Sequence, residues 1–325
     1  MGKLLGKGLH LMALLLLTMV SCGGAKSGAA TAPAAEKEGA AVPAFSADSA
    51  MAYVRAQLGF GERVPGSEAH RLTADWLVAK LRGFGAQVTE QKADLKAFDG
   101  TVLHARNIFG RFHPERERRI LLLAHYDTRP WADEDPDPAN RNKPVPGAND
   151  GASGVAVLLE TARALQTADP GTGVDILFVD AEDYGTEGDD DSWALGAQHF
   201  AENPPVEGYA PDGAILLDMV GGKDAAFPPE YFSVQAAPAL DAAFRRAAAE
   251  AGHGRLFGGT VAGAVTDDHV KLIERGIPAI DIIDYREGQG FNPTWHTLDD
   301  NIDNIDPATL RAVGESLLHF LYGNP

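Results

Sequence analysis

The chain has 325 residues, of which 45% are hydrophobic, and it carries a formal net charge of −18 at pH 7. This composition is sufficient for a large buried core. The negative charge, with no cluster of basic residues to neutralise phosphates, argues against a nucleic-acid partner. The single cysteine excludes a framework of intramolecular disulfides.

The first 22 residues have the pattern of an export signal. Lys3 and Lys7 provide positive charge, and residues 9–20 are apolar but too few to span a bilayer. Ser21 followed by Cys22 is similar to a bacterial lipoprotein cleavage site, whose cysteine carries the lipid. A soluble secretory signal with a chance cysteine is the alternative. We therefore expect an exported lipoprotein of the cell envelope (periplasm), held at a membrane only through a lipid on Cys22.

The signal is followed by a segment of low complexity. Residues 23–45 are rich in Ala, Gly, Ser and Pro and contain almost no large apolar side chains, which predicts a flexible tether. We expect residues 46–325 to form a single domain and the protein to be a monomer.

The first half of that domain begins with helices and continues with strands. Two helices are predicted within residues 47–83, where apolar residues recur at helical spacing in the second. Residues 88–95 and 103–112 are predicted strands, and the apolar run 120–124 is typical of a strand buried on both faces. A long loop, 131–149, separates it from the next helix.

The second half alternates strands and helices. Apolar strands are predicted at 176–179 and 213–217, with a further strand near the end of 266–283. The predicted helices are 192–201, 237–251, a short one at the start of 266–283, and 307–321. This alternation predicts an α/β fold with a mixed, mostly parallel sheet covered by helices on both faces.

Two acidic runs, 132–137 and 188–192, stand out along the chain. Such runs are usually solvated loops, and a weak calcium site is the alternative at either one.

Five segments each place a potential metal ligand or acid just after a strand or in a loop. They are His125, Asp150, the pair Glu182 and Asp183, Asp218, and His296. Each residue, taken alone, could instead have a purely structural role, such as a helix cap or a solvated acid pair. In open α/β sheets, however, ligands bind beyond the carboxyl ends of the strands. Imidazole and carboxylate donors without thiolates suit a catalytic zinc ion.

Six stretches of the chain resemble the family of zinc-dependent aminopeptidases and the animal-type and bacterial glutaminyl cyclases that share their fold. In chain order they are LLLAHYDTRP, GANDGASGV, LFVDAEDYG, AILLDMVGG, TDDHVKLIERGIPAIDIID and WHTLDDNID. They extend from about His125 to the C-terminus, with weaker likeness back to about Phe45. The resemblance implies an aminopeptidase-like α/β/α sandwich.

The resemblance also implies roles for particular residues. Asp150, Asp183 and His296 match the ligands of a single zinc ion, and Glu182 matches the general acid/base. Asp183 departs from the glutamate that is common at its position, although it is similar to the bacterial cyclases. His125 matches a ligand of the second metal in the aminopeptidases.

Asp267 separates the two activities in this resemblance. The cyclases carry an aspartate at this position, and it pairs with the aspartate that Asp218 matches. The aminopeptidases typically carry a non-acidic residue there. The alternative interpretation of Asp267 is that it only caps the following helix. Trp295 matches a pocket wall, and Trp193 adds a second aromatic surface. We therefore expect an enzyme that cyclises N-terminal glutamine of peptides. A zinc aminopeptidase, or a binding domain that has lost catalysis, remains as an alternative.

Overall fold

The computed structural model describes residues 41–323 of the chain. The predicted export signal and most of the predicted tether lie outside these residues. Phe45, at the end of the predicted tether, is buried and packs beside Gly314 near the C-terminus. Within residues 41–323, no helix is both long enough and apolar enough to cross a membrane.

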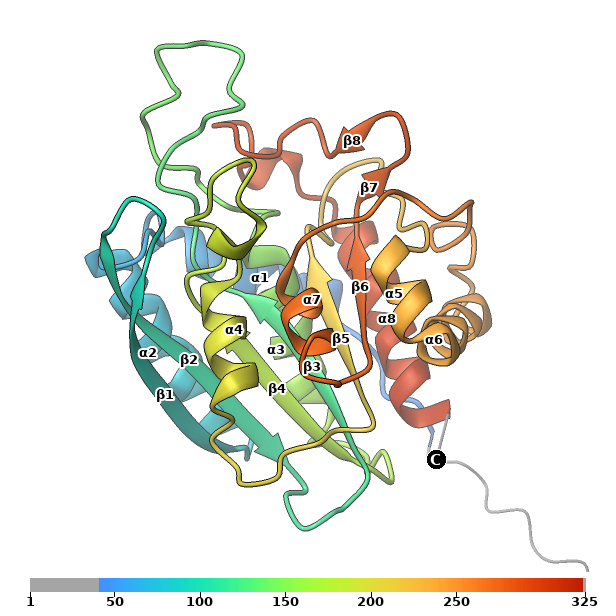
Figure 1. Cartoon of the computed structure of the whole chain (residues 1–325). Helices are drawn as coiled ribbons and strands as arrows, with labels where there is room; N and C mark the ends of the chain where they lie inside the picture. The colour runs from blue at the N-terminus through green and yellow to red at the C-terminus, as the bar shows by residue number, and fades with distance from the viewer. Residues whose placement is uncertain (1–40, 324–325) are drawn as a thin grey trace, which may run out of the picture. The chain divides into compact units, whose positions relative to one another are not determined.

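A six-stranded sheet forms the centre of the domain, with the strand order β1-β2-β4-β3-β5-β6 (Figure 1). Strands β4, β3, β5 and β6 are parallel neighbours, whereas β2 pairs antiparallel with both β4 and β1. The prediction of a mixed, mostly parallel sheet is therefore confirmed. The bounds of the strands are β1 Gln87–Lys96, β2 Val102–Phe112, β3 Arg119–His125, β4 Gly173–Val179, β5 Gly213–Asp218 and β6 Ala279–Ile283.

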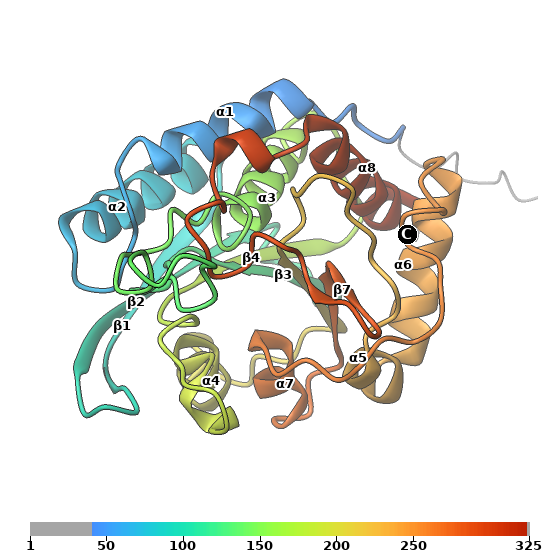
Figure 2. The same ribbon diagram turned by 90° about the horizontal axis from the view of Figure 1, so that it is seen from above.

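Helices cover both faces of this sheet. Seen from above, α1, α2, α3 and α8 lie on one side of the strands, and α4 and α7 lie on the other (Figure 2). Helix α6 packs against α8 beyond β6. The helix bounds are α1 Ala47–Leu58, α2 Glu68–Gly83, α3 Ala152–Ala164, α4 Leu195–Glu202, α5 Tyr231–Ala236, α6 Pro238–Glu250, α7 Asp268–Ile273 and α8 Pro307–Gly323.

The central strand β3 contributes to the core on both of its faces. Leu122 and Ala124 belong to the large apolar cluster shared with α1, α3 and α8. Leu121 and Leu123 point the other way, into the cluster that contains Phe200 of α4. Because successive strand side chains alternate between faces, a strand covered on both sides needs the uninterrupted apolar run that the sequence displays.

The sequence prediction differs from the structure at three places. The helix expected at 192–201 is a short 3-10 turn, Asp190–Ser192, followed by α4. The helix expected at 237–251 is preceded by a second one, α5, because Ala237 leaves the helical conformation directly before Pro238. A small hairpin, β7 (Tyr285–Arg286) and β8 (Gly290–Phe291), was not expected.

Gly154 allows α3 to lie close to the sheet beneath the candidate site. A Cβ atom at this position would meet the Leu217 carbonyl oxygen at 2.1 Å and the Ala124 Cβ at 3.0 Å. We expect Gly154→Ala to lower the free energy of unfolding by about 1–3 kcal/mol, as overpacking of a core does. Urea unfolding measures this change. Gly83→Ala is the control, because nothing lies within 4 Å of a Cβ there; equal stability of the two variants would contradict the proposed crowding.

Candidate metal centre and active site

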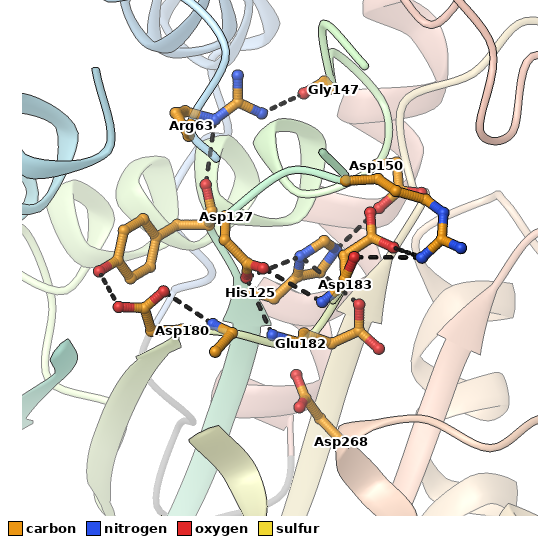
Figure 3. A network of polar contacts seen from close by, with 12 residues as sticks. Arg63, His125, Asp127, Gly147, Asp150, Asp180, Glu182, Asp183 and Asp268 are labelled. Carbon is orange, nitrogen blue, oxygen red and sulfur yellow. Dashed lines mark hydrogen bonds and ion pairs between the residues drawn. The ribbon is translucent and has the colours of Figure 1, made fainter. Parts of the chain in front are cut away.

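The carboxyl ends of three adjacent parallel strands meet at one edge of the sheet (Figure 3). β3 ends at His125 and β5 ends at Asp218, while the chain that leaves β4 carries the acid pair. Loops before α3 and before α8 add one residue each. The ligand-type side chains that gather here, as predicted, are His125, Asp150, Glu182, Asp183, Asp218 and His296.

These side chains form two groups that share Asp150. In the first, donor atoms of Asp150, Asp183 and His296 lie within 4.8 Å of one another, and His296 Nε2 is 3.2 Å from Asp183 Oδ1. In the second, His125 Nε2 lies 3.0 Å from Asp150 Oδ1 and 3.2 Å from Asp218 Oδ1. All five residues are buried. The first group is the set predicted to hold zinc, and the second contains the predicted second-metal residue.

The backbone around these residues adopts conformations that non-glycine residues rarely take. His296 itself has φ of 53°, Ala181 before the acid pair has 54°, and Met219 after Asp218 has 48°. Left-handed backbone at such residues costs free energy and persists only where the surroundings enforce it. Three of the six non-glycine residues with positive φ among residues 41–323 therefore lie at or close to ligand-type side chains.

The site contains more carboxyl groups than its cations balance. Burial raises the pKa of Glu182 well above its usual value; His125 opposes this rise, and Asp267 and Asp183 add to it. Burial, followed by Asp218 and Asp268, likewise raises the pKa of Asp267. A divalent cation would offset this excess of negative charge. Two carboxylates and an imidazole, buried together, also form a donor set that fits zinc and leaves one position open.

Asp127 supports the acid pair and was missed by the sequence prediction. Its Oδ1 accepts the Glu182 amide at 3.2 Å, and its Oδ2 accepts the Asp183 amide at 3.1 Å. The same carboxylate lies 3.5 Å from His125 Nδ1. The sequence feature that could have indicated this role is the position of Asp127, two residues after His125 and just past the end of the apolar run.

Asp300 supports Asp150 in the same way, and it was also missed. It accepts the Asn149 amide at 2.7 Å and the Asp150 amide at 3.0 Å. Arg63, a fully buried arginine, donates to the carbonyl oxygens of Pro146 and Gly147 in the same loop. Asp300 follows His296 by four residues, so it links the segments that carry two of the predicted ligands.

A cavity of about 410 Å³ opens at this edge. Trp295 stacks on His296 with 3.8 Å between ring centroids, and Trp193 stacks near the same ring at 6.2 Å. Both tryptophans line the cavity. Among the cavity-lining residues are all of the predicted catalytic, zinc-ligand and pocket residues: Asp150, Glu182, Asp183, Trp193, Asp218, Asp267, Trp295 and His296.

Asp267 fits both of the interpretations considered for it. Its side chain accepts the Asp268 amide at 2.5 Å and caps α7, and it also lines the cavity with Asp218. It belongs to a further close group with His269 and Asp281 that the sequence prediction missed. Neither acidic run supplies a close set of three metal-ligand atoms within residues 41–323.

The profile of peptidase family M28 matches residues 107–321. The chain belongs to this family. Among solved M28-like structures, a glutaminyl cyclase from Porphyromonas gingivalis is 50% identical, with a TM-score of 0.85 over 87% of this chain and 100% of that one. A Zn-dependent exopeptidase from Parabacteroides distasonis is 49% identical, with the same TM-score and coverage.

A more distant relative extends the same comparison. The glutaminyl-peptide cyclotransferase of Bos taurus is 24% identical over 293 residues, which cover 80% of this chain and 78% of that protein. The predicted family and fold class are thus confirmed. Membership of M28, the likeness to a Zn-dependent exopeptidase and the buried His/Asp/Asp group together point to zinc as the metal.

Proposed function

We propose that the protein is a glutaminyl-peptide cyclotransferase, which converts N-terminal glutamine of peptides or proteins into pyroglutamate and releases ammonia. The observation that carries this proposal is the buried Asp267, which lines the cavity together with Asp218 and Glu182. The likeness to solved bacterial glutaminyl cyclases over most of the chain supports it.

In this proposal the chain's own residues position and deprotonate the substrate. Asp150, Asp183 and His296 would hold one zinc ion, which supplies a Lewis acid for the γ-carbonyl of the substrate. Glu182, on the cavity wall, takes a proton from the substrate's α-amine as the nitrogen bonds to the γ-carbon. It then returns that proton to the amide nitrogen as the carbon–nitrogen bond breaks and ammonia leaves.

The walls of the cavity contribute by folding the substrate. Trp295 and Trp193 both line the cavity and offer aromatic surfaces for a compact side chain. Closing a five-membered ring needs the α-amine and the γ-carbon to meet, and holding them together removes part of the entropic barrier. No water has to be activated, so one metal ion suffices for this reaction.

In this proposal, the number of bound metal ions depends on whether Asp218 can act as a ligand. Two neighbouring buried carboxylates do not both ionise readily, so Asp218 and Asp267 would share a proton. Asp218 is then a poor ligand for a second metal. The second candidate function, a two-metal aminopeptidase, is favoured by the group of His125, Asp150 and Asp218 and by the likeness to a Zn-dependent exopeptidase.

Product analysis separates the two functions. Peptides of the form Gln-Xaa are incubated with residues 41–325, which retain the buried Phe45, and followed by mass spectrometry. The proposal predicts loss of ammonia with the peptide bond intact. Release of free glutamine would instead establish the aminopeptidase, and an unchanged peptide would refute both.

We also propose that Cys22 carries a lipid that holds the protein at a membrane of the cell envelope. The support is the order of charged, apolar and small residues before this cysteine. Cys22→Ala is expected to leave unprocessed precursor or to release the enzyme from the membrane fraction. Unchanged gel mobility and unchanged fractionation would refute the lipid anchor.

A further inference from the structure

Arg129 is a buried arginine in the cavity wall that the proposed chemistry does not use. It lies in the loop after β3, lines the cavity and is only 3% exposed. A buried guanidinium is costly unless its donors are paired. Its partners therefore indicate what it holds in place.

One edge of the guanidinium binds Asp133. Arg129 Nε donates to Asp133 Oδ1 at 2.8 Å, and Nη2 donates to Asp133 Oδ2 at 2.5 Å. Two parallel hydrogen bonds of this kind fix both the position and the plane of a carboxylate. The same Asp133 Oδ1 lies 3.5 Å from Nδ1 of His296.

The other edge faces the chain that follows β4. Arg129 Nη1 donates to the backbone oxygens of Asp183 at 3.3 Å and Gly185 at 3.2 Å, and it lies 3.4 Å from Asp183 Oδ1. The rings of Trp131 and Trp193 lie 5.1 and 4.9 Å from the guanidinium carbon. These aromatic contacts hold the guanidinium between the two segments.

The two ring nitrogens of His296 face different partners. Nδ1 faces Asp133, whereas Nε2 lies 3.2 Å from Asp183 Oδ1 and 3.8 Å from Asp150 Oδ2. A carboxylate that accepts the proton of Nδ1 leaves the lone pair of Nε2 free for a metal. At 3.5 Å from Nδ1, Asp133 is the carboxylate placed to favour the tautomer of His296 whose Nε2 could bind zinc, and Arg129 holds Asp133 in place.

We propose that Arg129 is a positioning residue that aligns two zinc ligands, Asp183 by direct contact and His296 through Asp133. The inference rests on the zinc site described under the proposed function. Lysine cannot take over this role, because a single ammonium group does not make two parallel bonds to Asp133 while also reaching Asp183 and Gly185.

The experiment measures zinc affinity of the metal-free protein by competition with a chromophoric chelator. Loss of a residue that orients a metal ligand typically weakens metal binding by about 10–100-fold, and we expect this loss for Arg129→Lys. Asp133→Asn should weaken zinc binding in the same way. Because both residues act through one chain of contacts, the double variant should lose less than the product of the two single losses.

Arg119→Lys is the matched control. Arg119 is also a buried arginine, and it binds both oxygens of Asp175 in β4. Arg119 is the first residue of β3 and so lies at the end of that strand away from His125. Its substitution should lower the unfolding temperature of the metal-free protein and leave zinc affinity unchanged. If Arg129→Lys does not fold, Asp133→Asn carries the test.

Two results would overturn different statements. Wild-type zinc affinity in both Arg129→Lys and Asp133→Asn would refute the positioning role. A wild-type protein that takes up no zinc would refute the metal site itself, whatever the variants do.

Discussion

Glu182→Gln should bind zinc as wild type does and lose roughly 10²–10⁴-fold in kcat for Gln-Xaa peptides, the range that a general acid/base contributes. The substitution keeps the size and polarity of the side chain but removes its ability to accept and return a proton. Zinc content by elemental analysis and the rate of ammonia release measure the two effects separately.

The structure explains why zinc binding should survive this change. Glu182 belongs to neither group of close donor atoms formed by its neighbours Asp150, Asp183, Asp218, His125 and His296. The two adjacent acids face different partners, because Glu182 Oε2 lies 4.0 Å from His125 Nδ1, whereas Asp183 Oδ1 lies 3.2 Å from His296 Nε2.

Glu187→Gln provides the control for Glu182. Glu187 lines the same cavity but is exposed and stands outside the groups of ligand-type residues. It should retain the wild-type rate. A Glu182→Gln enzyme within a factor of a few of wild type, with zinc bound, would remove Glu182 from the mechanism.

His296→Ala should lose most of the bound zinc and, with it, nearly all activity. It removes one of the three proposed zinc ligands and the ring on which Trp295 stacks. A metal that binds the folded protein more tightly than the unfolded chain raises the unfolding temperature, so we expect zinc to raise it for wild type but not for this variant. Wild type is expected to carry one zinc ion per chain, and treatment with a chelator should reproduce the loss.

Asp183→Ala should behave like His296→Ala, losing zinc and activity together, in contrast to Glu182→Gln. His104→Ala is the control for His296→Ala, because His104 is exposed on β2 and pairs with Asp94 of the neighbouring strand β1. Retention of stoichiometric zinc by His296→Ala would contradict the ligand assignment. Two zinc ions per wild-type chain, both needed for turnover, would favour the aminopeptidase.

The proximity of His125, Asp218 and the acid pair could be predicted because each of them ends or closely follows an apolar strand, whereas Asp150 and His296 lie in loops. His125 and Asp218 end apolar strands, and the acid pair follows another strand closely. Parallel strands place such ends together, so strand position alone indicated proximity. Strand position did not indicate which reaction the site catalyses, and the prediction of a glutaminyl cyclase came from the family resemblance.

The supporting residues could not be predicted by the same reasoning. Asp127 and Asp300 act through backbone amides of distant segments, and such contacts leave no periodic pattern in the sequence. Arg63 and Arg129 were equally hidden, because a charged residue in a loop is ordinarily solvated. Their burial depends on the path of the long loop, which local propensity does not determine.

The order of the ligand-type residues along the chain affects when metal can be acquired during biosynthesis. Asp150 and Asp183 are made first, whereas His296 and its neighbour Asp300 are made only shortly before α8. A nascent or truncated chain that stops before His296 therefore lacks both a proposed ligand and the carboxylate that holds the Asp150 segment. With the proposed ligand set, we expect zinc to bind at this site only after residues 296–300 have been made, and chains that end before them to accumulate without metal.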